Sequence, residues 1–134
     1  MAQLSDAQRA FLEDNAFVAT VTTLRADGSP HSTVVWVDTD GGVVRFNTFR
    51  GAAKERHLGR DPRVSVAVLD PRDPWHWVAV SGTAELIEEG ADAHIDRLAQ
   101  KYLGVESYPY RDPAERRVTV RVTPVTVASA GFSA

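Results

Sequence analysis

The chain of 134 residues contains no cysteine, and this absence removes several chemistries at once. Without cysteine there is no disulfide, no thiolate nucleophile and no cysteine-ligated metal centre, which fits a cytoplasmic protein. No apolar run approaches the roughly 18 residues that a membrane-spanning helix needs. The N-terminus turns polar almost at once, so a secretory signal is not expected either.

A broad basic surface and the common catalytic motifs are also missing. The formal net charge is -3 and the pI is near 5.8, which argues against nucleic acid as the main partner. There is no G-x-S-x-G, P-loop or G-x-G-x-x-G pattern, and the four histidines lack the spacing of a metal site. We therefore predict no metal, and the motifs leave the catalytic residues unknown.

What is present predicts a single, mainly β domain over residues 1–134, with short helices. Gly82 lies inside one predicted strand and indicates a bulge or a close backbone approach. Short polar turns between strands favour an antiparallel, closed or nearly closed six-stranded barrel. Alternating and β-branched residues predict strands at 17–24, 31–37, 43–48, 63–69, 75–86 and 117–127, the last interrupted by Pro124. Helices are expected at 5–14, just after residue 50 and at 92–103.

The first helix carries a capping box formed by Ser5 and Gln8, and Ala7, Ala10 and Phe11 are expected to face inward. Gly104 fits the position just after the end of the third helix. These local signals set where two of the helices begin and end.

A cationic stretch stands out in this acidic chain: Arg50, Lys54, Arg56, Arg60 and Arg63 follow one another closely. Such a concentration favours a pocket for an anion, most simply a phosphate, but a solvated helix face explains the charges equally well. Lys54 and Arg56 are two residues apart and do not share a helix face, so one faces a ligand and the other solvent or a carboxylate. Arg60 and Arg63 are expected to pair with nearby carboxylates.

Four segments together resemble the split β-barrel superfamily of flavin- and deazaflavin-binding proteins that is named for pyridoxamine 5′-phosphate oxidase. They are residues 21–31, 46–48, 54–64 and 75–84, and the third has a lysine-arginine-leucine-arginine-aspartate-proline-arginine spacing. The likeness is strongest to the branch that binds coenzyme F420. It implies an FMN-binding-protein-like split barrel and a homodimer with cofactor sites at the subunit interface.

The resemblance also implies an activity, that of an F420H2-dependent reductase. Such an oxidoreductase transfers a hydride from the reduced deazaflavin to a conjugated small-molecule substrate, and needs neither a metal nor a nucleophile. Two alternatives stay open: an FMN-binding oxidase or reductase of the same superfamily, and a protein that binds or carries F420 without turnover. The identity of the substrate cannot be read from the sequence.

Several cofactor-binding residues follow from the resemblance. Lys54 is expected to hold the cofactor phosphate, with Arg56 able to bind it in bidentate fashion. Asn47, Thr48 and Arg50 lie where a strand runs into the cationic helix, a place where backbone amides converge on anions. Many relatives carry an arginine at the position of Ala52, and Arg50 is the candidate substitute.

The remaining candidates are expected to contact the ring system. Ser32, Thr33 and Val34 match strand positions that run along the ring edge. Trp75 and Trp77, taken as i and i+2 of one strand, project from the same face. They form either a wall against the cofactor of the other subunit or part of the dimer packing, and the two roles are compatible. Tyr108 and Tyr110 are predicted to rim the substrate opening.

Overall fold

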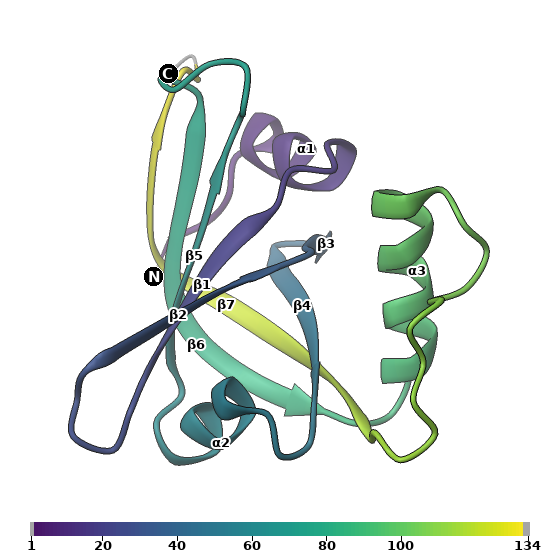
Figure 1. Ribbon diagram of the computed structural model, residues 1–134. Coiled ribbons are helices and arrows are strands. Elements are labelled where there is room, and N and C mark those ends of the chain that lie inside the picture. The colour runs from purple at the N-terminus through teal and green to yellow at the C-terminus, as the bar shows by residue number, and fades with distance from the viewer. Residues whose placement is uncertain (1, 133–134) are drawn as a thin grey trace.

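The computed structural model describes residues 2–132, which form one antiparallel sheet flanked by three helices (Figure 1). The predicted mainly β class is confirmed. No helix in the described part of the chain has the length and apolar character to cross a membrane. In chain order the elements are α1 Asp6–Asp14, β1 Ala19–Leu24, β2 Pro30–Val35, β3 Asp38–Asp40, β4 Val43–Phe49, α2 Ala53–Arg60, β5 Arg63–Leu69, β6 Trp77–Ile87, α3 Ala91–Leu103 and β7 Arg117–Ala130.

The sheet has seven strands in the order β2-β1-β5-β6-β7-β4-β3 and is not closed by hydrogen bonds. The predicted number of six strands is therefore wrong, and of the two predicted forms, closed or nearly closed, the fully closed barrel is not found. The additional strand is β3, a three-residue strand in a segment that the sequence indicated as a turn. Its residues pair with β4 because the polar turn is shorter than expected and leaves Asp38 to Asp40 free to extend the ladder.

The two edges of the sheet nevertheless approach one another. β2 and β3 lie at opposite ends of the strand order, yet only residues 36–37 separate them along the chain. Consecutive Cα atoms are about 3.8 Å apart, so such a short link cannot cross a flat seven-stranded sheet. The sheet curls into an incompletely closed barrel, and Figure 1 shows β2 running directly into β3.

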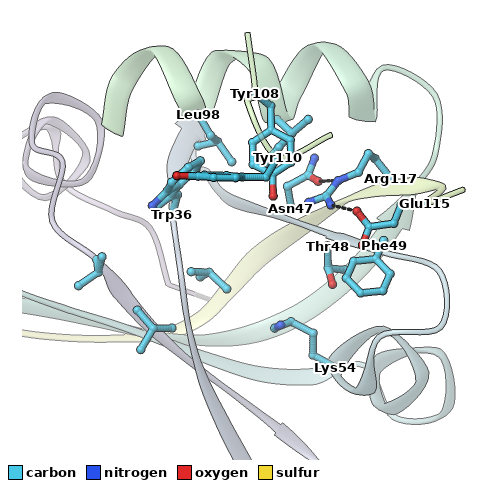
Figure 2. Close-up of a pocket in the computed structure, with 14 residues that line it drawn as sticks. Trp36, Asn47, Thr48, Phe49, Lys54, Leu98, Tyr108, Tyr110, Glu115 and Arg117 are labelled. Carbon is cyan, nitrogen blue, oxygen red and sulfur yellow. Dashed lines mark hydrogen bonds and ion pairs between the residues drawn. The ribbon is translucent and has the colours of Figure 1, made fainter. Parts of the chain in front are cut away.

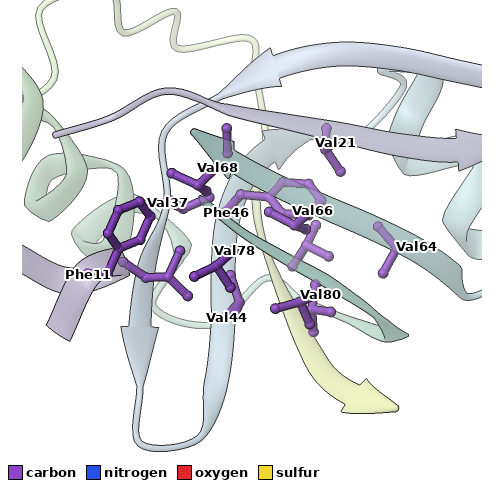
Figure 3. Packing of buried hydrophobic residues seen from close by; sticks show 14 of the residues in the cluster. Phe11, Val21, Val37, Val44, Phe46, Val64, Val66, Val68, Val78 and Val80 are labelled. Atoms are coloured by element: carbon purple, nitrogen blue, oxygen red, sulfur yellow. The ribbon is translucent and has the colours of Figure 1, made fainter. Parts of the chain in front are cut away.

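The inner face of the curled sheet is packed with valine (Figure 3). Along β5, Val64, Val66 and Val68 are buried while Ala67 and Leu69 between and after them are exposed. This alternation follows from the two-residue period of a strand, which places successive side chains on opposite faces. The sequence pattern therefore decided which face of each strand is buried.

Helix α1 begins as predicted and packs differently from the prediction. The Ser5 hydroxyl accepts from the Gln8 backbone N–H at 3.1 Å, and the Gln8 side chain accepts from the Ser5 N–H at 2.9 Å, which confirms the capping box. The prediction that Ala7 and Ala10 face inward is wrong, since both are exposed. The helix docks through its second half instead, where the larger Phe11 and its neighbour are buried.

The β6–β7 pair is the longest ladder of the sheet and contains the expected irregularity at Gly82. A register shift lies between Ser81 and Gly82, and a Cβ added at Gly82 would stand 2.1 Å from the backbone oxygen of Thr123. The predicted bulge and close approach are both confirmed. β7 continues through Pro124, contrary to the predicted interruption, because Pro124 lies opposite the bulge, where a ladder hydrogen bond is already lost.

Candidate functional site

A pocket of about 310 Å³ opens between the edge strand β2, the end of β4, helix α3 and the loop before β7 (Figure 2). Its walls combine two cations, one carboxylate and a cluster of aromatic rings. Such a mixture suits a flat ligand that carries an acidic group. The lining residues are Val18, Val34, Val35, Trp36, Asn47, Thr48, Phe49, Lys54, Ile95, Leu98, Tyr108, Tyr110, Glu115 and Arg117.

The floor of the pocket is formed where β4 runs into α2. The strand ends at Phe49, and Gly51 turns the chain with a φ of 98°, a left-handed conformation that favours glycine. Ala52 then caps α2 without a side-chain hydrogen bond, and Lys54 lies in the first turn of that helix. The sharp turn therefore brings the Lys54 side chain back toward the end of the strand, beside Thr48.

Lys54 is a cation without a compensating carboxylate in the part of the chain that the structure describes. Burial lowers its pKa, and the positive charge of Arg117 lowers the pKa further. No acidic group offsets either effect. A half-buried, uncompensated ammonium costs free energy in the absence of a ligand, and an anion in the pocket would relieve that cost.

Arg117 is a second cation in the pocket wall, and the sequence indicated no role for it beyond the start of a strand. Its side chain is 9% exposed. The Nε–H donates to the Asn47 side-chain oxygen at 2.9 Å, and Nη1 lies 3.3 Å from a Glu115 carboxylate oxygen. The guanidinium also lies over the rings of Tyr108 and Phe49, at 5.3 Å and 5.8 Å from their centroids. These contacts hold the guanidinium in one orientation.

Aromatic rings form the opposite wall of the pocket. Trp36 stacks on Tyr102 with ring centroids 5.4 Å apart, and Tyr108 meets the edge of Trp36 at 6.2 Å. Tyr110 lies next to Tyr108 at 5.7 Å, so both predicted rim tyrosines line the pocket. The Tyr102 hydroxyl donates to the Phe17 backbone oxygen, and burial raises the pKa of Tyr102 to about 12. Tyr102 therefore supports the wall and is unsuited to proton transfer near neutral pH.

The structure brings some of the predicted cofactor residues to this pocket. Lys54, Thr48, Asn47 and Val34 all line it. Thr33 lies on the same strand as Val34, and its buried hydroxyl has no hydrogen-bond partner within residues 2–132.

The other predicted residues lie outside the pocket lining. Ser32 is exposed and shares a hydrogen bond with Thr22 at 2.9 Å. The Arg50 side chain points to two carboxylates, those of Glu55 and Glu88, each at 3.0 Å. Arg56 donates to the Gly51 backbone oxygen.

The two tryptophans do not share a strand as the sequence suggested. β6 begins at Trp77, while Trp75 lies in the preceding turn and is 76% exposed. The predicted strand start at residue 75 is wrong because the turn through Asp70 and Asp73 runs on to His76, with backbone hydrogen bonds that exclude Trp75 from the ladder. Neither tryptophan lines the pocket of its own chain.

Within the described residues, no group of three or more histidine, aspartate or glutamate side chains could hold a metal ion. The pocket instead offers cations, aromatic faces and the free edge of β2. A curled antiparallel sheet of this kind is a small split barrel, and its pocket lining suits a flat ligand that carries an acidic group.

The comparison with known families agrees with that class. The model of the pyridoxamine 5′-phosphate oxidase family matches residues 4–130, so the chain belongs to this family. A similar protein of Mycobacterium tuberculosis, F420H(2)-dependent biliverdin reductase, is 34% identical over 125 residues, which cover 90% of this chain and 83% of the relative.

Solved structures give the same placement. A structure named F420 reductase superposes with a TM-score of 0.79 at 28% identity and covers 89% of this chain and 94% of its own. A conserved hypothetical protein of M. tuberculosis superposes with a TM-score of 0.76 at 27% identity, covering 97% and 88%. The resemblance seen in the sequence is thus confirmed at the level of family and fold.

Proposed function

We propose that this protein is an F420H2-dependent reductase. The observation that carries the proposal is Lys54, a half-buried cation in an aromatic pocket with no carboxylate to balance it within residues 2–132. The two relatives named for F420 support the choice of this coenzyme over FMN.

The residues present fit a flat cofactor with an acidic tail. Lys54 and the hydroxyl of Thr48 would hold the phosphate at the floor of the pocket. β2 is an edge strand, so one row of its backbone N–H and C=O groups is free to bond the polar edge of a ring beside Val34. Trp36 and Tyr110 would cover the ring on the aromatic side.

When bound, reduced F420 supplies a hydride from C5 of its ring, and with one proton from solvent this adds two electrons and two hydrogens to a conjugated double bond. The chain itself binds the acidic tail, aligns the substrate plane and excludes water from the pocket. Tyr108 and Tyr110 lie on the loop before β7 and are positioned to contact the substrate. No side chain of the chain is needed as nucleophile.

We further propose that the protein works as a homodimer. A second cleft, of about 370 Å³ and mainly apolar, lies on the outer face of the sheet around Ser65 and Val125. Leu69 and Val125 on the sheet are more than half exposed, and so is Trp75 in the turn before β6. A second copy would bury this surface and could bring Trp75 or Trp77 against the open side of the pocket.

The deciding experiment is a titration of the purified protein with F420 and with FMN, followed by fluorescence quenching. We expect saturable binding of F420 and much weaker binding of FMN. Reoxidation of F420H2 in the presence of enones, quinones and tetrapyrroles then separates an enzyme from a carrier. Preference for FMN would overturn the choice of cofactor, and F420 binding without turnover of any of these substrates would favour the carrier.

Light scattering after gel filtration tests the dimer. A protein that stays monomeric at micromolar concentration, with and without F420, would contradict it. Leu69→Asp places a charge on the proposed contact surface and is expected to yield monomers, whereas substitution of the exposed Glu106 in the loop far from this face should leave the dimer intact.

A further inference from the structure

A chain of buried polar side chains crosses four elements and ends in the pocket. It starts at Asp38 in β3, continues through His94 in α3 and Asn47 in β4, and reaches Arg117 at the start of β7. Asp38, Asn47 and His94 are all buried. Buried polar networks of this kind are costly unless each member is satisfied, so the orientation of every group is informative.

The Asp38 carboxylate sets the hydrogen position on His94. The distance from His94 Nε2 to Asp38 Oδ1 is 3.1 Å, and a carboxylate oxygen can only accept, so Nε2 carries the hydrogen. Arg45 and Arg97 also donate to Asp38 and keep it ionised. In the neutral ring, Nδ1 is therefore left as an acceptor.

The acceptor on His94 in turn sets the direction of the Asn47 amide. The Asn47 nitrogen lies 3.2 Å from His94 Nδ1 and 3.0 Å from the Ala91 backbone oxygen, so its two hydrogens have two acceptors. The Asn47 oxygen then faces Arg117 and accepts from Nε–H at 2.9 Å. A reversed amide would oppose acceptor to acceptor at His94 and Ala91, and donor to donor at Arg117.

Arg117 is the point at which this chain meets the ligand space. Because Nε–H donates to Asn47, the terminal nitrogens of Arg117 face the Glu115 carboxylate and the pocket (Figure 2). Lys54 faces the same space with a pKa that burial and the charge of Arg117 both lower. One carboxylate, Glu115, lines the pocket against these two cations, so the lining keeps a net positive charge.

We propose that Asp38 and His94 are positioning residues that act through Asn47 to aim Arg117 at the acidic tail of the bound cofactor. The inference rests on the proposed function, since it takes the tail of F420 as the anion. It assigns to β3 and α3, which lie outside the cationic α2 segment, a part in cofactor affinity. If the network only held α3 against the sheet, changing it would affect the affinity for ligands with and without the acidic group equally.

The test compares F420 with its deazaflavin chromophore lacking the phosphate tail, on wild type, His94→Leu, Arg117→Gln and the double variant. We expect His94→Leu and Arg117→Gln each to weaken F420 binding by about tenfold, the effect of one charged hydrogen bond, with chromophore binding unchanged. The double variant should lose no more than Arg117→Gln alone, because both changes remove the same contact.

Thr119→Val is the matched control. The Thr119 hydroxyl lies 3.0 Å from the same His94 Nδ1 but is not on the path to Arg117. Its loss should lower stability while leaving F420 affinity unchanged. Should His94→Leu fail to fold, His94→Phe keeps a ring at this position without a donor or an acceptor and provides the same comparison.

A readout without ligand separates this inference from the proposed function. The side-chain Nε–H of Arg117 should give a slowly exchanging NMR signal in wild type and Thr119→Val, and lose protection in His94→Leu. Additive losses in the double variant, equal weakening of the chromophore, or an unchanged Nε–H signal would overturn the positioning role. Failure of wild type to bind F420, with the Nε–H signal behaving as expected, would refute the proposed cofactor alone.

Discussion

Replacing Lys54 by methionine should move stability and cofactor affinity in opposite directions. The pKa of Lys54 is lowered first by burial and then by the charge of Arg117, so the folded protein without ligand carries an unfavourable charge at neutral pH. Methionine fills a similar volume and has no charge. The unliganded Lys54→Met protein should therefore unfold at a higher temperature than wild type.

The same substitution should weaken F420. A charged hydrogen bond to a phosphate contributes roughly 1 to 3 kcal/mol, which corresponds to roughly a 5- to 150-fold rise in Kd. Fluorescence titration measures Kd, and differential scanning calorimetry of the same samples gives Tm. An unchanged Kd in a folded Lys54→Met protein would refute the assignment of Lys54 to the acidic tail.

Lys101 provides the matched control for this prediction. Burial also lowers its pKa, but its ammonium donates to the backbone oxygens of Leu12 and Val37, each at 2.6 Å. Lys101→Met leaves both acceptors buried without that partner, so it should lower stability by about 1 to 3 kcal/mol and leave F420 affinity unchanged. If Lys54→Met and Lys101→Met changed Tm and Kd in the same way, burial alone, and not the absence of a hydrogen-bond partner, would decide the change in stability.

Two further outcomes concern the fold. Gly82→Ala places a Cβ 2.1 Å from a backbone oxygen of β7, so it should lower the free energy of unfolding in urea by at least about 3 kcal/mol. Gly59→Ala in α2 meets no neighbouring atom within 4 Å and should raise the free energy of unfolding by about 0.5 to 1 kcal/mol. Equal effects of the two substitutions would contradict the close approach at Gly82. Burial raises the pKa of Asp38, but hydrogen bonds from His94 and Arg45 outweigh burial and hold the pKa below the ordinary 3.8. The Asp38 carboxylate therefore contributes stability above pH 3.8, and this contribution is lost as the pH falls through the lower pKa of the folded state. Urea midpoints between about pH 5 and pH 2 should fall more steeply for wild type than for Asp38→Asn, and parallel slopes would contradict this.

Local sequence patterns predicted most of the elements of the fold. The capping box at Ser5, the strand at residues 63–69 and the bulge at Gly82 involve near neighbours or a single strand, and all three are confirmed. The position of α3 was also close, with Gly104 at its end in the left-handed conformation. β3 was missed because three polar residues between turns carry no alternation that a period can detect.

The candidate site was harder to predict because its walls come from distant parts of the chain. Lys54 and Thr48 lie in two neighbouring family-like segments, 54–64 and 46–48, so the sequence could indicate them. Arg117 and Trp36 carry no such pattern. The one available signal for Arg117 was a strand that opens with an arginine two residues after Glu115.

The chemistry of the two cationic residues illustrates what each level of structure determines. By itself the sequence determined that the chain is mainly β and that its strands bury one valine-rich face. It also determined that a cationic helix follows the strand ending at Phe49. All three properties depend on the spacing between near neighbours in the chain. Only the tertiary structure decided which cations matter. The curl of the sheet and the docking of α3 bury Lys54 and Arg117 in one pocket. Arg50, in contrast, lies against the carboxylates of Glu55 and Glu88. Burial and ion pairing depend on contacts between residues far apart in the chain, which spacing along the sequence does not reveal.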